Sequence, residues 1–178
     1  MQSLWRNVFG PGGSSDAEDV LGDVRLFEEL GARERDVLLR VLHRREYVAG
    51  ESVFVQGEPG LGMYVIASGL VSIQNENTGR ELVELGDGDV FGEIALLNEV
   101  IRTATARAKT DCTLYSLFQP DLHGLLERNP RLGVKILLGL ARMVGLRLVE
   151  VSEELDAHMR RAEATEAAGA PSEGHAPA

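Results

Sequence analysis

Two charged residues, Glu93 and Arg102, stand nine positions apart in a segment whose other residues favour ligand binding. The guanidinium of arginine is a planar fork that matches phosphate oxygens, and a carboxylate accepts hydrogen bonds from sugar hydroxyls. Gly92 allows a tight turn and the close approach of a ligand, and the backbone N–H groups near Ile94 and Ala95 open a short helix that suits an anion. The pair indicates a ligand with both a phosphate and a hydroxyl. The alternative, from these two residues alone, is an ordinary ion pair at a barrel corner.

The pattern of apolar residues predicts the elements that position this segment. Between residues 44 and 117, short alternating apolar runs are separated by glycine-rich turns, which predicts a compact all-β sandwich or barrel. Before it, apolar residues at helical spacing predict helices at about 17–30 and 33–43, the second burying Val37, Leu38, Val41 and Leu42. After it, two prolines open helices at about 120–128 and 130–160.

The last predicted helix carries an apolar seam along one side. Its members recur at alternating steps of four and three residues: Leu137, Ala141, Val144, Leu148, Val151 and Leu155. This heptad spacing is typical of helices that pair with one another. We expect the first half of the helix to pack on the β-domain and the second half to pair with a second copy of the chain as a homodimer. The alternative is that the whole helix packs on its own barrel.

The segment around Glu93 and Arg102 resembles the phosphate-binding cassette of the cyclic nucleotide-binding domain family. Residues 91–97 read FGEIALL, and residues 102–105 read RTAT. The resemblance extends to the QGEPG turn at 56–60 and to the GDGDVFG approach at 86–92, and it covers about residues 26–148. It implies an α+β fold: a β-roll flanked by N-terminal helices and a long C-terminal helix.

The resemblance also implies roles for individual residues. Glu93 would bind the ribose 2′-hydroxyl, and Arg102 would bind the cyclic phosphate together with Gly92 and the backbone near Ile94 and Ala95. Thr103 would place a hydroxyl near the phosphate or the base. The expected base and lid contacts are Val71, Leu85, Met143, Val144, Arg147 and Leu148.

One position departs from the family pattern. Ile101 stands where the family commonly has proline, which would fix the backbone before the arginine. Its absence makes the loop more flexible, which weakens binding but removes neither ligand group. The sequence leaves two candidate nucleotides. One is cAMP, the more frequent ligand of the family, and the other is cGMP, whose amino group Thr103 could contact.

The composition excludes several classes of function. With 28 acidic and 18 basic residues the net charge is -10, which argues against a binder of nucleic acids or anionic membranes. Because Cys112 is the only cysteine in the sequence, an internal disulfide and a metal site with several thiolate ligands are excluded. With no targeting segment or membrane span, we expect a cytoplasmic protein. No nucleophile–base arrangement is present, so we expect neither an enzyme nor a cofactor beyond the nucleotide ligand.

The chain is predicted to divide into three parts. Residues 1–16 form an apolar segment and linker, 17–160 the cyclic nucleotide-binding domain with its C-terminal helix, and 161–178 a disordered tail. The apolar segment contains Leu4, Trp5, Val8 and Phe9, which would pack on the domain, across a dimer or on another protein. The acidic residues after the last helix offer no recognition helix, so we expect a stand-alone module that does not bind DNA.

These observations predict a non-enzymatic cyclic nucleotide sensor. Binding would move the C-terminal helix or change the oligomeric state, and an effector protein would detect that change. The alternative is a scaffold domain of the same fold that acts without nucleotide.

Overall fold

The computed structural model describes residues 21–22 and 24–169 of the chain. The predicted apolar segment of Leu4, Trp5, Val8 and Phe9 therefore lies outside the described residues. The helices are η1 (a 3-10 helix), α2, α3, α4 and α5, at Arg25–Phe27, Ala32–Leu39, Ile94–Leu97, Gln119–Arg128 and Pro130–Gly169. The strands β1 to β8 span His43–Tyr47, Ser52–Phe54, Gly62–Ser68, Val71–Asn75, Arg80–Leu85, Val90–Phe91, Thr105–Ala108 and Cys112–Phe118.

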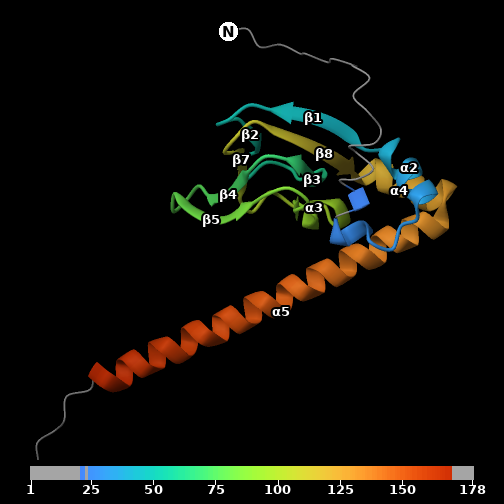
Figure 1. Ribbon diagram of the computed structural model, residues 1–178. Helices are drawn as coiled ribbons and strands as arrows, with labels where there is room; N and C mark the ends of the chain where they lie inside the picture. The colour runs from blue at the N-terminus through green and yellow to red at the C-terminus, as the bar shows by residue number, and fades with distance from the viewer. Residues whose placement is uncertain (1–20, 23, 170–178) are drawn as a thin grey trace, which may run out of the picture. The chain divides into compact units, whose positions relative to one another are not determined.

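Two antiparallel four-stranded sheets form a β-roll (Figure 1). One sheet has the strand order β1-β8-β3-β6 and the other β2-β7-β4-β5. Alternation along the strands turns one set of side chains inward, and residues of both sheets share one core cluster: Tyr47, Tyr64, Ile66, Val71, Phe91, Ala106, Ala108, Cys112 and Leu114. The predicted α+β fold, a β-roll flanked by helices, is confirmed.

The first N-terminal helical segment differs from the prediction in its second half. In the expected helix at 17–30, the described residues Leu21 and Gly22 are helical, and after them the chain forms the 3-10 turn η1, in which Phe27 N–H donates to the Val24 carbonyl at 2.8 Å. Val24, Phe27 and Leu30 are all buried, and their spacing of three residues fits the period of a 3-10 helix. A period of three at a few positions is difficult to distinguish from the α-helical period in a sequence.

The second helix, α2, ends at Leu39 rather than at residue 43. His43 instead begins β1, where it pairs with Ser116 of β8. Of the residues predicted to be buried, Leu38 and Leu42 are buried, Val41 is partly buried and Val37 is exposed. Long-range strand pairing therefore overrides the local helical pattern here.

The C-terminal helix α5 is longer than predicted. Residues 161–169, which were predicted to belong to a disordered tail, continue the helix to Gly169. Their alanine and glutamate content favours a helix, which explains the extension. The chain divides into two units between Gly139 and Leu140, within α5, and each unit is described by itself.

The first turns of α5 pack closely on their own unit. Leu132 and Ile136 are fully buried. A Cβ at Gly139 would lie 2.4 Å from the Leu26 carbonyl oxygen, and one at Gly133 would lie 2.7 Å from Leu126 Cδ2. The two glycines therefore allow α5 to approach η1 and α4 more closely than a larger residue would permit.

Candidate functional site

Arg102 is a buried cation that donates hydrogen bonds to backbone carbonyls. Its side chain is 6% exposed, Nη2 donates to the Gly62 carbonyl at 2.8 Å, and Nη1 donates to the Gly92 carbonyl at 3.3 Å. The guanidinium carbon lies 3.9 Å from the centre of the Phe54 ring. Nε is buried and has no hydrogen-bond partner within the described part of the chain. The guanidinium is thus held in place with part of its donor capacity unused.

The backbone of Arg102 is fixed by the turn that precedes β3. Arg102 N–H donates to the Glu58 carbonyl at 2.8 Å, and Gly57 N–H donates to the Arg102 carbonyl at 2.9 Å. An isolated bridge between Pro59 and Ile101 extends this pairing. The QGEPG turn and the arginine segment, far apart in sequence, are therefore one structural unit.

Glu93 interacts electrostatically with this cation. It is 6% exposed, and its negative charge favours the protonated form of Arg102. Burial has the larger effect and lowers the pKa of Arg102, although an arginine remains charged in proteins. Both residues therefore lie in a region with little solvent, where electrostatic interactions are stronger than at the surface.

Gly92 is required between these two side chains. Its φ is +74°, which L-residues with a side chain rarely adopt. A Cβ there would lie 2.8 Å from Arg102 Nη1 and 3.3 Å from the Gly62 carbonyl oxygen. The left-handed glycine lets the chain turn from β6 into α3 without displacing the guanidinium.

The helix after Gly92 is a single turn. Ala95 N–H donates to the Gly92 carbonyl at 3.2 Å, and Leu96 N–H donates to the Glu93 carbonyl at 3.0 Å. The Ala95 N–H would therefore have to exchange its acceptor to bind an anion. The Ile94 side chain is exposed, whereas Ala95 is buried.

The remaining predicted site residues fall into three groups. Thr103, directly after the arginine, is exposed. Val71 and Leu85 lie opposite each other in the β4–β5 pair, with Val71 fully buried in the core and Leu85 packed against it. The predicted lid residues Met143, Val144, Arg147 and Leu148 lie on α5 beyond residue 139, in the second unit.

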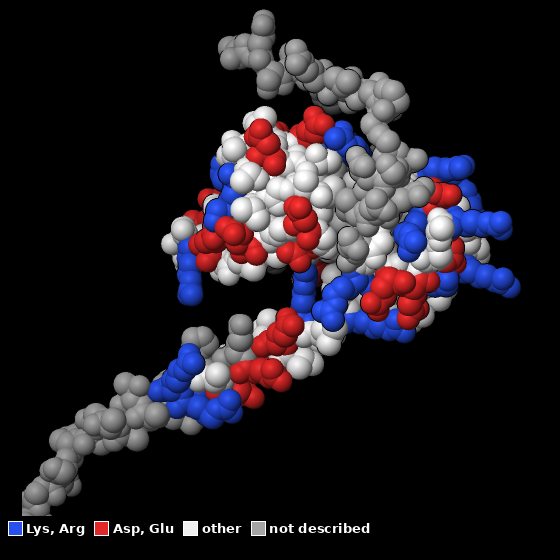
Figure 2. Space-filling view, in the orientation of Figure 1, with Lys and Arg blue, Asp and Glu red and all other residues white. Residues whose placement is uncertain are grey.

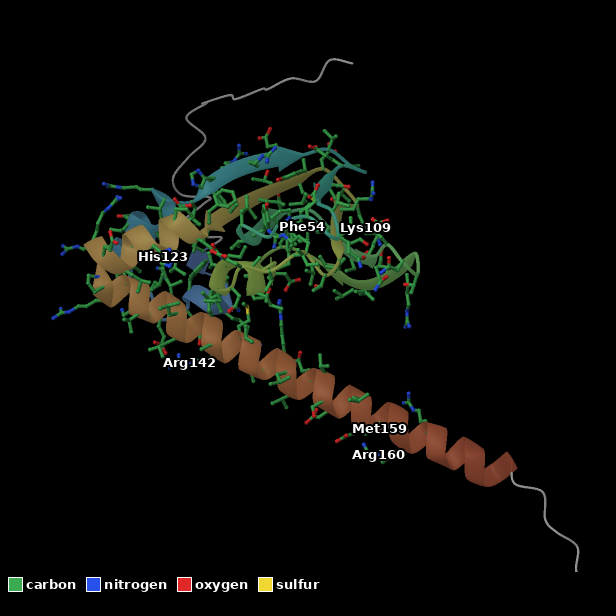
Figure 3. All side chains as sticks on the ribbon, turned by 180° about the vertical axis from the view of Figure 1, so that it is seen from behind. Phe54, Lys109, His123, Arg142, Met159 and Arg160 are labelled. Atoms are coloured by element: carbon green, nitrogen blue, oxygen red, sulfur yellow. The ribbon has the colours of Figure 1, made fainter. Side chains whose placement is uncertain are left out.

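Sequence reasoning missed an aromatic cluster beside Arg102. Phe54 lies among the strands of the roll (Figure 3), with its ring centre 5.7 Å from that of Tyr64 and 5.9 Å from that of Phe91. The rings of Tyr64 and Phe91 stack at 5.3 Å. The signal available in the sequence was alternation, which turns Phe54 and Tyr64 inward, but nothing there links Phe54 to Arg102.

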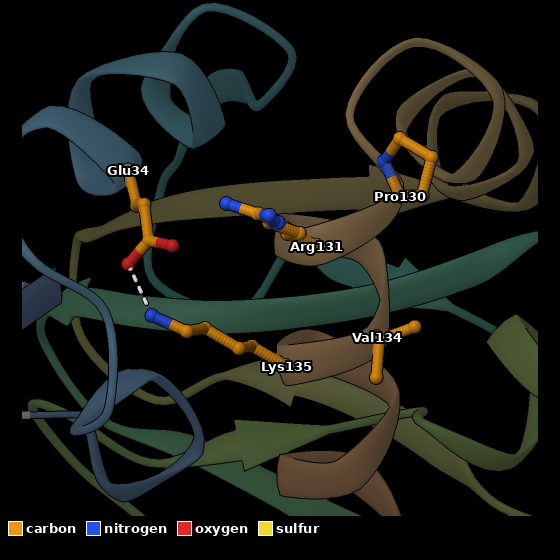
Figure 4. Close-up of a pocket in the computed structure, with 5 residues that line it drawn as sticks. All are labelled: Glu34, Pro130, Arg131, Val134 and Lys135. Carbon is orange, nitrogen blue, oxygen red and sulfur yellow. Dashed lines mark hydrogen bonds and ion pairs between the residues drawn. The ribbon is translucent and has the colours of Figure 1, made fainter.

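A shallow hollow of about 550 Å³ lies elsewhere in the first unit (Figure 4). Its lining residues come from α2 and from the start of α5: Glu34, Pro130, Arg131, Val134 and Lys135. Basic side chains project from this end of the molecule (Figure 2). The hollow shares no residue with the cassette.

Over residues 21–22 and 24–169, no helix combines the length and the apolar character needed to cross a membrane.

Comparison with known proteins identifies the family of this chain. Residues 44–129 match the model of the cyclic nucleotide-binding domain family. The cyclic AMP receptor protein of Thermus thermophilus is 39% identical over 134 residues, which span 74% of this chain and 60% of the relative. This chain thus spans less than two thirds of the length of that curated relative.

Two solved structures support the same assignment. The catabolite activator protein of Thermus thermophilus has a TM-score of 0.68 at 37% identity, covering 76% of this chain and 63% of that one. The N-terminal domain of a transcriptional regulator from Streptomyces coelicolor has a TM-score of 0.65 at 30% identity, covering 72% of this chain and 94% of that domain. From its sequence, its fold and these relatives, the chain belongs to the cyclic nucleotide-binding domain family.

Proposed function

We propose that this chain is a non-enzymatic sensor that binds cAMP at the cassette. The observation that supports this proposal best is the buried guanidinium of Arg102, whose Nε has no partner among the described residues. An unpaired donor on a buried cation is costly, and the oxygen of an anionic ligand would satisfy it. The relative named cyclic AMP receptor protein supports the choice of this nucleotide.

In this proposal each cassette residue has one task. Arg102 binds the cyclic phosphate, and the glycine at 92 leaves room for the ligand next to the guanidinium. The buried Glu93 accepts a hydrogen bond from the ribose 2′-hydroxyl. The exposed hydroxyl of Thr103 contacts the phosphate or base, so cGMP is the competing ligand. No other cofactor is needed, because the domain binds and does not transform the nucleotide.

The signal leaves the domain through α5. Leu148, Val151 and Leu155 of the predicted seam are 69%, 61% and 58% exposed, which suits pairing with a second copy. Binding would bring Met143, Val144, Arg147 and Leu148 over the base and shift an equilibrium between two positions of the helix. An effector protein would detect the change.

Calorimetry with cAMP and cGMP tests the proposal. We expect heat with at least one nucleotide and stronger binding of cAMP. Absence of heat with both at millimolar concentration would overturn the proposal and favour a scaffold role. Light scattering with and without nucleotide tests the dimer. In that experiment Val151→Glu should give a monomer, whereas Glu150→Gln, a neighbouring change off the seam, should not.

A further inference from the structure

We propose that Phe54 is a positioning residue, whose ring orients the Arg102 guanidinium for the phosphate before the ligand binds. The inference rests on the proposed nucleotide binding and adds a residue outside the cassette sequence. Phe54 belongs to β2, 48 positions before Arg102, and the family pattern described above does not include it.

The geometry is that of a stacked cation. The guanidinium carbon lies 3.9 Å from the Phe54 ring centre and 5.8 Å from that of Tyr64, both within the range of cation–π attraction. The Phe54 ring is itself held by the rings of Tyr64 and Phe91. These neighbouring rings therefore restrict the movement of the Phe54 ring.

A sheet irregularity turns Phe54 toward this position. Between Ser52 and Phe54, the pairing of β2 with β7 shifts register from Arg107 to Ala106. A bulge of this kind re-aims the side chain that follows it. As a result Phe54 packs on the core cluster and also lies over the guanidinium.

An uncharged platform suits a ligand site better than a carboxylate would. A buried cation needs compensation, and a carboxylate hydrogen-bonded to the guanidinium would occupy the edge that phosphate requires. The ring face and the Gly62 and Gly92 carbonyls stabilise the cation without neutralising it. They also reduce the rotamer freedom that a long side chain would otherwise lose on binding.

The test compares Phe54→Leu with Phe54→Tyr, which keeps the ring. Because desolvated cation–π contacts are among the stronger ones, we expect Phe54→Leu to weaken cAMP binding about tenfold. Phe54→Tyr should bind within about twofold of the parent protein. Phe118→Leu is the matched control, since it makes the same change at a half-buried ring that stacks on His43 at 5.2 Å. It should leave affinity unchanged.

A second readout needs no nucleotide. In the proton NMR spectrum of the unliganded parent protein, the Arg102 Nε–H signal should lie upfield of its usual position, because this proton lies over the Phe54 ring. The signal is identified by its loss in Arg102→Lys. Phe54→Leu should remove this shift, and Phe54→Tyr should retain it. Thermal unfolding of all variants shows whether each one is folded.

The outcomes separate the two proposals. If the parent binds cAMP and Phe54→Leu binds as tightly as Phe118→Leu, the positioning role is wrong while the binding function stands. If the parent gives no heat with nucleotide, the binding function fails, and the proton shift alone reports whether the ring holds the guanidinium. An unshifted Nε–H in the unliganded parent would also overturn the stack.

Discussion

The cassette and the α2–α5 hollow each contain a carboxylate that interacts electrostatically with a cation, but the surroundings of the two pairs differ. In the hollow, Lys135 Nζ lies 2.6 Å from Glu34 Oε2, and both side chains are partly exposed to water. In the cassette, Glu93 and Arg102 are buried, and the guanidinium is held by two carbonyls and a ring. The hollow is an open space beside a satisfied ion pair, whereas the cassette is a closely packed region with an unsatisfied donor.

This difference shows why the hollow is the weaker candidate for a ligand site. Lys135 also donates to the Glu29 carbonyl, and Glu34 also accepts from Gly31 N–H at 2.9 Å, so both charges have several partners. A ligand there would have to displace existing hydrogen bonds. At the cassette, a ligand oxygen would supply the hydrogen-bond acceptor that Arg102 Nε lacks among the described residues. The new hydrogen bond lowers the net cost of desolvation on binding.

The largest expected effect is at Arg102. Replacing it in Arg102→Leu removes a charge-assisted contact to phosphate, which typically costs about 2–5 kcal/mol of binding free energy. Calorimetry with cAMP should therefore show a loss of about thirtyfold or more. Arg107→Leu is the matched control, because Arg107 donates to the Gly50 carbonyl on an exposed part of the roll. Equal affinity of the two variants would place the ligand elsewhere.

Glu93 should give the next largest effect. Glu93→Gln keeps the shape of the side chain but weakens its hydrogen bond to the ribose hydroxyl, and a bond to a charged group contributes about 1.5–3 kcal/mol. The parent should prefer cAMP over its 2′-deoxy analogue, and Glu93→Gln should bind both nearly equally. If the variant kept the parent's preference, the carboxylate would not contact that hydroxyl.

A third experiment tests the contrast in packing. A Cβ at Gly60 would lie 2.4 Å from Ala95 Cβ and 2.9 Å from the Val100 carbonyl oxygen, so Gly60→Ala must displace the cassette. We expect the free energy of unfolding to fall by about 1–3 kcal/mol, with weaker cAMP binding.

Gly124→Ala in α4 provides the control for Gly60→Ala. A Cβ at Gly124 would meet only the flexible end of Arg128, at 3.5 Å. Alanine should therefore raise the free energy of unfolding by about 0.5–1 kcal/mol through its helix propensity. Urea unfolding measures both variants. Equal stability of Gly60→Ala and the parent would mean that the cassette is loosely packed.

A sequence can predict the structural features that are encoded by residues close together in the chain. Alternating apolar runs predict an all-β sandwich or barrel, because the strand period turns the inward residues to one core. The family resemblance then implies that this domain is a β-roll. The cassette was recognised from one short segment, which the structure folds as a left-handed glycine followed by one helical turn. Its roles in ligand binding remain predictions.

Features that depend on long-range pairing were missed. Phe54 meets Arg102 only because β2 pairs with β7 through a register shift. The end of α2 is set by the pairing of His43 with Ser116, which are 73 positions apart. Neither contact has a local signature, so apolar spacing alone predicted an α-helix through residue 43 and left Phe54 without a role.

The smallest expected effect is at the hollow, and its pH dependence tests whether the ion pair there is a surface feature. The hydrogen bond from Lys135, with a smaller contribution from Gly31 N–H, holds the pKa of Glu34 below its ordinary value of 4.5. A carboxyl whose pKa is lower in the folded state stabilises the fold above its unfolded pKa, and this contribution is lost as the pH falls through the folded value. Lys135→Met should therefore cost about 0.5 kcal/mol at neutral pH and almost nothing in strong acid, with cAMP affinity unchanged. Urea unfolding at several pH values measures this. A cost that stayed constant with pH would show that Lys135 acts through the packing of its apolar stem rather than through its charge.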